Sequence, residues 1–264
     1  MIRQMLRNLK MYRKLDEMGW KEILIYRLQT AVWLVGSIFS TIAGFVIVTV
    51  IYGVSAGIPG WSYFQLLALT SIANIAGGFL AYYVSIYSMV GKMRNGGIDM
   101  MLTKPVNPVI YIIMLFASQQ SAPTIASGTL MLAYSLYNLH IALLPLLAFI
   151  PAFGLGALAI VLFGLSFGLV LYVIFKEGRF GYWLLDSLQQ ATNYPLKIYG
   201  GLGVTVFTLF IPFGIAVFYP AELLLSKISY PYLFAVIGFE LLLIAIFYTF
   251  SKWVIENKYV SGGG

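Results

Sequence analysis

Two long stretches of the chain contain no charged side chain. Residues 28–91 and residues 105–175 lack Asp, Glu, Lys and Arg and consist mostly of apolar side chains. A helix rises about 1.5 Å per residue, so roughly 20 residues cross a hydrocarbon layer about 30 Å thick. Each stretch is therefore long enough for two membrane-spanning helices with a turn between them.

Glycine, proline and polar residues mark where the spans end. Turn formers gather at residues 55–60 and 138–145, a longer polar stretch covers residues 176–200, and a short break lies at residues 220–231. Pro123 and Pro151 fall inside predicted spans and are expected to kink them, because proline removes a backbone donor. The pattern predicts one transmembrane domain over residues 1–264, with six spans at about residues 31–54, 63–90, 109–137, 146–175, 201–219 and 232–253.

The composition excludes an ordinary soluble domain. Hydrophobic residues make up 61% of the 264 residues and charged residues 9%, whereas charged residues form about 25% of a typical soluble domain. The predicted fold class is therefore an all-α membrane protein with six transmembrane helices.

The basic residues predict which side of the membrane each connection occupies. Lys and Arg are retained on the cytoplasmic side during insertion. With six spans, fifteen of the sixteen Lys and Arg residues fall on one side, including Lys197 in the connection 176–200, and only Lys227 falls on the other. Both termini are therefore predicted to be cytoplasmic, and the longer connections face the cytoplasm.

The N-terminal segment has the pattern of an amphipathic helix. Apolar residues from Ile2 to Leu15 recur at helical spacing among basic residues, and the pattern resumes at Trp20 after an expected break at Gly19. One interpretation is a helix that lies on anionic lipid and orients the protein. The other is an elbow helix that packs on the first span and contacts a cytoplasmic partner.

Several kinds of chemistry are absent from the sequence. The chain has no cysteine and one histidine, His140, which falls in a predicted outer turn. Its one Gly-Lys pair, Gly91-Lys92, lacks the rest of a phosphate-binding loop. We therefore predict that the chain is not an enzyme, has no catalytic or metal-binding residues, and binds no cofactor itself.

One acidic residue, Glu240, falls near the middle of the sixth predicted span. A charged carboxylate in lipid costs about 3 kcal/mol on insertion scales, so this side chain must face protein or a wet cavity, or be protonated. Two interpretations stay open. Glu240 is either a neutral carboxyl group that packs against a neighbouring helix or a polar point on a substrate pathway.

The connection after the second span is predicted to contain a short apolar helix. Its sequence GIDMMLTKPVNP, residues 97–108, places a capping residue, Asp99, before apolar positions and ends at Pro105. Such a helix at the end of a bundle can dock into a groove of another protein. In the simpler interpretation Asp99 is only a cap, Leu102 packs beneath its own bundle and Lys104 only sets the topology.

The sequence resembles the permease subunits of type-2 ABC exporters, in a branch long described only as a domain of unknown function. The resemblance rests on residues 97–108 and on three further landmarks that occur in the family's order over most of the chain. These are residues 193–199 (NYPLKIY), residues 211–213 (IPF) with 219–221 (YPA), and residues 258–262 (KYVSG).

The resemblance implies the type-2 ABC exporter transmembrane fold and roles for individual residues. It implies an elbow helix at about residues 15–29, a coupling helix at about residues 97–104, and an outer re-entrant hairpin at residues 213–229. The coupling helix would dock on the ATPase through Gly97, Asp99, Met101, Leu102, Lys104 and Pro105. The hairpin would place Pro212, Tyr219 and Pro220 at an outer gate.

The resemblance also implies partners and a location. Two permease subunits, identical or related, would form a pathway at their interface in the inner (plasma) membrane of a prokaryote. Separate cytoplasmic ATPase subunits would hold ATP and Mg, while the chain itself would contact lipid and no nucleic acid. The alternative is a secondary transporter or channel that works without ATP. A drug, lipid, peptide or glycan substrate is equally compatible with the sequence.

Overall fold

The computed structural model describes residues 2–99 and 106–260. Throughout these residues the regular structure is helical. The helices are α1 (Ile2–Ile25), α2 (Arg27–Val54), α3 (Tyr63–Tyr83), α4 (Ile86–Arg94), α6 (Pro108–Leu115), η1 (Gln119–Ser121), α7 (Ala122–Leu139), α8 (Leu143–Phe175), α9 (Arg179–Ala191), η2 (Leu196–Tyr199), α10 (Gly200–Thr205), η3 (Val206–Phe210), η4 (Gly214–Phe218), α11 (Tyr219–Leu224) and α12 (Pro231–Asn257).

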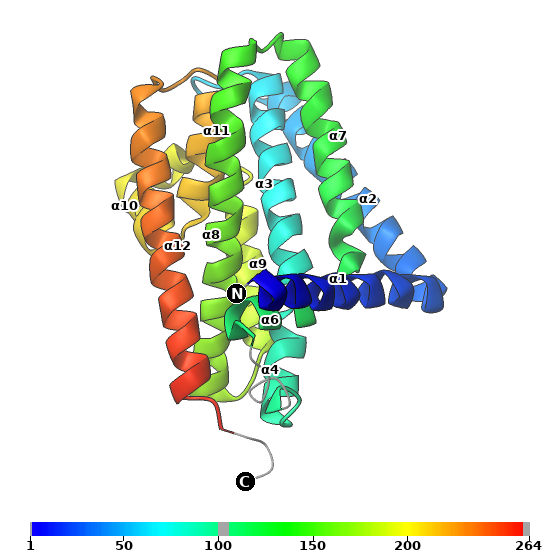
Figure 1. Ribbon diagram of the computed structural model, residues 1–264. Helices are drawn as coiled ribbons and strands as arrows, with labels where there is room; N and C mark the ends of the chain where they lie inside the picture. The colour runs from blue at the N-terminus through cyan, green and yellow to red at the C-terminus, as the bar shows by residue number, and fades with distance from the viewer. Residues whose placement is uncertain (1, 100–105, 261–264) are drawn as a thin grey trace.

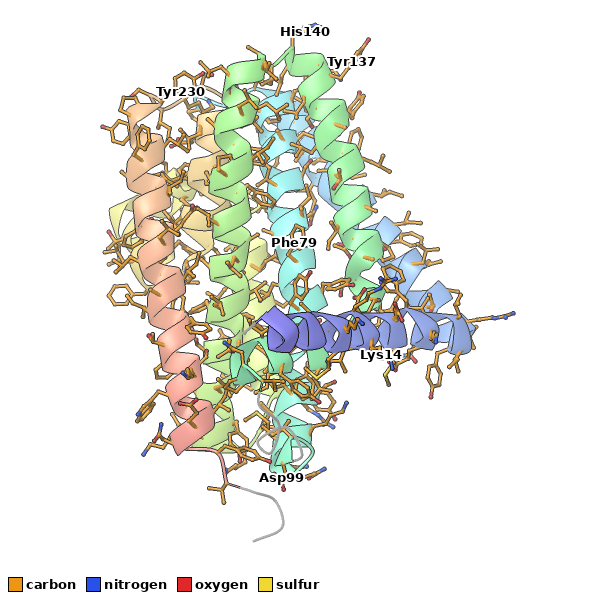
Figure 2. All side chains as sticks on the ribbon, in the orientation of Figure 1. Lys14, Phe79, Asp99, Tyr137, His140 and Tyr230 are labelled. Atoms are coloured by element: carbon orange, nitrogen blue, oxygen red, sulfur yellow. The ribbon has the colours of Figure 1, made fainter. Side chains whose placement is uncertain are left out.

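The long helices run side by side in one bundle, and α1 lies across it (Figure 1). The end of the bundle that carries His140 and Tyr230 is called the turn end, and the opposite end, which carries Asp99, is called the basic end (Figure 2). Four helical stretches, beginning at Arg27, Tyr63, Leu143 and Pro231, are long and apolar enough to cross a membrane. Two bent helix pairs bring the number to as many as six.

Helices α3 and α8 form the interior of the bundle, and small residues let the neighbouring helices approach. A Cβ atom added to Gly78 of α3 would lie 2.6 Å from Ile125 Cγ1 of α7, and one added to Gly128 of α7 would lie 3.0 Å from Ile75 Cγ1 of α3. Close backbone approach at glycine is how membrane helices gain packing energy without a hydrophobic driving force. These reciprocal contacts explain why the α3–α7 pair packs along its length.

Local signals set the helix ends at the turn end. The Ser62 hydroxyl accepts from the Gln65 backbone N–H, and the Gln65 side chain accepts from the Ser62 N–H, which makes a capping box at the start of α3. Gly57 and Gly60 have φ values of 76° and 77°, a region that side chains with a Cβ rarely adopt. The expected turn at residues 55–60 is therefore present, and α3 begins where the sequence predicts.

Gly19 and Pro123 act differently from the expectation, whereas the expected kink at Pro151 stays a prediction. The expected break at Gly19 is absent, because α1 continues to Ile25. Pro123 lies in the first turn of α7, and the 64° bend of this span falls between α6 and η1, in keeping with the preference of proline for helix starts. Helix α8 passes through Pro151 without ending.

The chain departs most from the expected course after α8. Residues 176–200 were expected to form a cytoplasmic connection, but α9 packs along α3 and α4. Gly178 lies beside Ile86 near the basic end, the Gln189 amide donates to the Ala73 carbonyl at 2.9 Å, and the Thr70 hydroxyl donates to the Asn193 carbonyl at 3.1 Å. Helix α9 therefore runs from the basic end along α4 and α3, and the residues that follow it reach the level of Thr70.

The stretch that follows is a lateral limb and a sharp bend. The limb, η2 to η3 (Leu196–Phe210), projects at the side of the bundle (Figure 1). The chain then turns by 91° into the arm η4 to α11 (Gly214–Leu224), which continues to the turn end. The limb and the arm together are apolar enough to form one broken span or a re-entrant loop, so residues 201–219 are not a single helix. We refer to α9, the limb and the arm together as the bent fifth crossing.

Candidate functional site

The segment after α4 at the basic end contains part of the expected coupling helix. Gly96 has a φ of 70°, and a Cβ atom on Gly97 would lie 3.0 Å from the Lys92 carbonyl oxygen, so the two glycines permit a tight turn. Ile98 is fully buried beneath this turn. The other expected docking residues, Met101, Leu102, Lys104 and Pro105, lie outside the described residues.

Asp99 is tied to the C-terminal segment. The Tyr259 hydroxyl donates to Asp99 Oδ1, and the Tyr259 ring stacks on Tyr172 of α8 with centroids 5.8 Å apart. Burial and the neighbouring Asp99 carboxylate raise the pKa of Tyr259 well above its ordinary value. The hydroxyl is therefore protonated at neutral pH and is available as the donor to Asp99.

A polar junction that the sequence did not reveal joins α1 to the bundle. Asp16 Oδ1 accepts hydrogen bonds from the Tyr82 hydroxyl at 3.0 Å and the Gln119 amide at 3.1 Å. These partners are 66 and 103 residues away in the chain. Gly19 lies directly over the Gln119 side chain. Helix α1 is thus held at one level of the bundle, where α3 and η1 meet.

An open cavity of about 620 Å³ lies between this junction and the basic end. Its lining combines aromatic and cationic side chains, among them Trp33, Tyr87, Lys92 and Arg179. Arg179 also lies over the Tyr87 ring. The cavity can hold an amphiphilic molecule, but the described residues contain no cluster of His, Asp or Glu that could bind a metal ion.

The bent fifth crossing contains the expected gate residues. Pro212 is buried at the 91° bend, whereas Tyr219 and Pro220 begin α11 inside the arm. The expected helix break at Pro220 is absent, since Pro220 stands in the first turn of a helix, where its missing N–H costs nothing. The bend falls inside the bundle, because Ala216, just after it, lies against Gly156 of α8.

An ion pair joins the limb to the arm. Lys197 Nζ lies 3.2 Å from Glu222 Oε1, with 73% of the lysine side chain exposed and 4% of the glutamate. Sequence reasoning missed this pair because it placed Lys197 in a cytoplasmic connection. The signal that could have revealed it is Glu222 itself, a lone acid in the apolar run 213–225.

A second lysine lies near the same carboxylate. The Lys227 ammonium donates to the Gly60 carbonyl and lies 4.4 Å from the centroid of the Trp61 ring. Burial lowers the pKa of Lys227; Glu222 opposes this shift, and the positive charge of Lys197 adds to it. One carboxylate therefore lies among two ammonium groups, which leaves the cluster of Lys197, Glu222 and Lys227 with a net charge of +1.

Glu240 of α12 faces protein. Its side chain is fully buried, and its Oε1 atom, like Ala216, lies close to Gly156. Neither carboxyl oxygen has a hydrogen-bond partner among the described residues, and the same holds for Asn193 Oδ1 and Thr208 Oγ1. Asn193 and Thr208 belong to the fifth crossing, and Glu240 packs against it. Buried polar atoms without a hydrogen-bond partner are therefore concentrated there.

Gly156 is expected to be essential for this packing. A Cβ atom at Gly156 would lie 2.6 Å from the Ala216 Cα atom and 2.9 Å from Glu240 Oε1, so even Gly156→Ala must push α8 away from η4. We expect a loss of about 1–3 kcal/mol in stability, measured as a lower thermal unfolding midpoint in detergent. Gly154→Ala, on the same helix but facing open space, is the control and should leave the midpoint unchanged or raise it.

The comparisons with known proteins assign the chain to a family. The family model described as "ABC-2 family transporter protein" matches residues 30–263. Neither the curated proteins nor the solved structures gave a match. The matched stretch runs from α2 through α12 and includes the turn before Asp99, the bent fifth crossing and the Tyr259 contact. Because the match covers nearly the whole chain, this protein belongs to the ABC-2 transporter family and is a membrane permease of that type.

Proposed function

We propose that this chain is the transmembrane permease subunit of an ATP-driven exporter, with a second permease subunit completing the pathway and separate ATPase subunits supplying the energy. The observation that carries the proposal is the family match over residues 30–263. The chain has no phosphate-binding loop of its own. ATP and Mg would therefore bind in the partner subunits.

The proposed orientation puts the basic end in the cytoplasm of a prokaryotic cell, at its inner membrane. Helices α4, α8 and α12 end there (Figure 1), and Arg94, Lys176 and Lys258 are at their C-terminal ends, in keeping with retention of basic residues inside. The ATPase subunits would dock there, on the segment 97–104. Helix α1 would be the elbow helix, at the membrane surface.

The second permease subunit would cover faces that the monomer leaves open. Leu202 and Phe210 of the limb are 82% and 71% exposed. The apolar window of α2 is only 11% buried. Lipid can cover an apolar helix such as α2, but the limb also carries the exposed ammonium group of Lys197, and a charged side chain at membrane depth faces protein or a water-filled path. The limb therefore favours a second subunit or a pathway over lipid.

The alternative is a secondary transporter or channel that works without ATP. One observation favours it: the Lys197–Glu222 pair adds charges to the bundle beyond Glu240, and charged residues inside the membrane often mark ion pathways. It would need no ATPase partner, which makes the two functions separable by experiment.

The test is affinity purification of the tagged chain after co-expression with its genomic neighbours. The proposal predicts that a protein with a phosphate-binding loop co-purifies in a fixed ratio and hydrolyses ATP. A stably folded chain that purifies without an ATPase, with every neighbour expressed, contradicts the proposal and favours the alternative.

A further inference from the structure

The level of Lys197 in the bilayer follows from α3. Tyr63 lies at the turn end beside the aromatic residues Tyr52 and Trp61, and such rings are enriched at membrane surfaces. Tyr82 lies 19 residues further along, level with α1 through its bond to Asp16, which is about 28 Å of helix. This spacing matches a hydrocarbon layer about 30 Å thick. Tyr63 and Tyr82 therefore mark its two boundaries.

Lys197 lies between these boundaries. Thr70, seven residues from Tyr63, is bonded to the Asn193 carbonyl, which puts the start of the limb about 10 Å inside the layer. Lys197 follows Asn193 by four residues, and its partner Glu222 lies on the arm between the bend and the turn end. The ammonium group is thus at hydrocarbon depth, yet most of the side chain is exposed on the bundle surface.

A charged lysine at this depth is unfavourable against lipid. Because the lysine side chain is exposed on the limb, this part of the limb faces a polar path or another subunit. The lysine-rich cluster has a net charge of +1, and exposed apolar side chains lie on the same limb at Leu202, Leu209 and Phe210. A cation beside apolar surface matches a molecule with a negatively charged group on an apolar body.

We propose that Lys197 binds the anionic group of an amphiphilic molecule that the exporter carries, exchanging its bond to Glu222 for one to the substrate. This proposal rests on the proposed function, because it identifies the limb as part of the transport pathway. When no substrate is bound, the Lys197 ammonium group stays paired with the Glu222 carboxylate. Lys227 adds positive charge near the same carboxylate without being exposed to the same degree.

The probe is dansyl-labelled undecanoic acid, with its methyl ester as the uncharged analogue. Binding is measured by fluorescence to the complex with its ATPase subunits in phosphatidylcholine nanodiscs. Lys197→Gln should weaken binding of the acid about tenfold or more and leave the ester unchanged. Glu222→Gln, which frees the ammonium group, should strengthen binding of the acid, and Lys197→Arg should retain it.

The control is Lys252→Gln, which breaks a Lys–Glu pair of 3.9 Å on α12 and should change nothing. The double variant Lys197→Gln with Glu222→Gln leaves no unpaired buried charge, so it keeps the test valid if the single variant does not fold, and it should also bind the acid weakly. Equal binding of acid and ester, or wild-type binding by the double variant, overturns the proposal.

A second arm separates two sources of the anionic group. If phosphatidylglycerol added to the nanodiscs competes with the acid, the ligand is a lipid headgroup. If it does not compete, the ligand is a free anionic amphiphile, and both results support the Lys197 site. A complex that still contains its ATPase but fails the acid-against-ester comparison refutes the Lys197 site alone. Absence of the ATPase refutes the proposed function instead.

Discussion

Replacing Leu102 with Asp and Lys104 with Glu together is expected to abolish co-purification of the ATPase subunits. In the proposed complex these residues lie on the docking helix between the turn at Gly97 and Pro105. Leu102→Asp puts a carboxylate into an apolar contact, and Lys104→Glu replaces an attractive charge with a repulsive one. Together they are expected to cost about 3 kcal/mol or more of binding free energy. That cost weakens association more than about a hundredfold. The measurement is the ATPase-to-permease ratio after affinity purification.

The control for this variant is Lys252→Glu, which reverses an exposed charge on α12 near the basic end and should leave the ratio unchanged. The thermal unfolding midpoint distinguishes docking from simple packing. If Leu102 only packs beneath its own bundle, the double variant will lower the midpoint. Unchanged ATPase recovery in a well-folded double variant would remove these two residues from the docking site.

Breaking the Lys197–Glu222 pair is expected to destabilise the bundle more when the lysine is replaced than when the glutamate is replaced. Lys197→Met leaves the buried Glu222 carboxylate without its partner, whereas Glu222→Gln leaves only a largely exposed lysine. Exposed pairs contribute up to about 1 kcal/mol and breaking buried pairs costs about 3–5 kcal/mol. We therefore expect about 2 kcal/mol for Lys197→Met and less for Glu222→Gln.

The double variant, Lys197→Met with Glu222→Gln, should recover most of the loss, because no unpaired buried charge remains. Denaturant unfolding of the four proteins in one detergent gives the interaction energy as a double-mutant cycle. If the losses of the two single variants simply add, the two side chains do not interact, and the pair has no structural role.

The helices whose positions were predicted best are those that depend on a single local property of the sequence. Helices α2, α3 and α8 follow from long charge-free stretches, and the start of α3 follows from Ser62 and the glycines before it. These features depend on residues adjacent in the chain and on the thickness of a bilayer. The family resemblance, built on short landmarks in a fixed order, is confirmed by the match over residues 30–263.

The fifth crossing could not be predicted in this way. Counting basic residues by connection treats every lysine as free, so Lys197 was assigned to the cytoplasm; its partner Glu222 lies 25 residues further along the chain. Asp16, Tyr82 and Gln119 meet for a similar reason, through contacts between distant segments. Glu240 was recognisable as an exception, but that it faces Gly156 and Ala216 depends on how α8 and η4 pack.

The most direct test of an ATP-powered pathway uses the absence of cysteine from the chain. Phe210→Cys places a single thiol on the exposed end of the limb, and Tyr137→Cys, on the exposed tip of α7, is the control. The rate of modification by a membrane-impermeant thiol reagent is measured in the reconstituted complex with and without ATP. The account predicts a several-fold change at residue 210 that requires the ATPase subunits, and none at residue 137. Equal rates at residue 210 with and without ATP would contradict it.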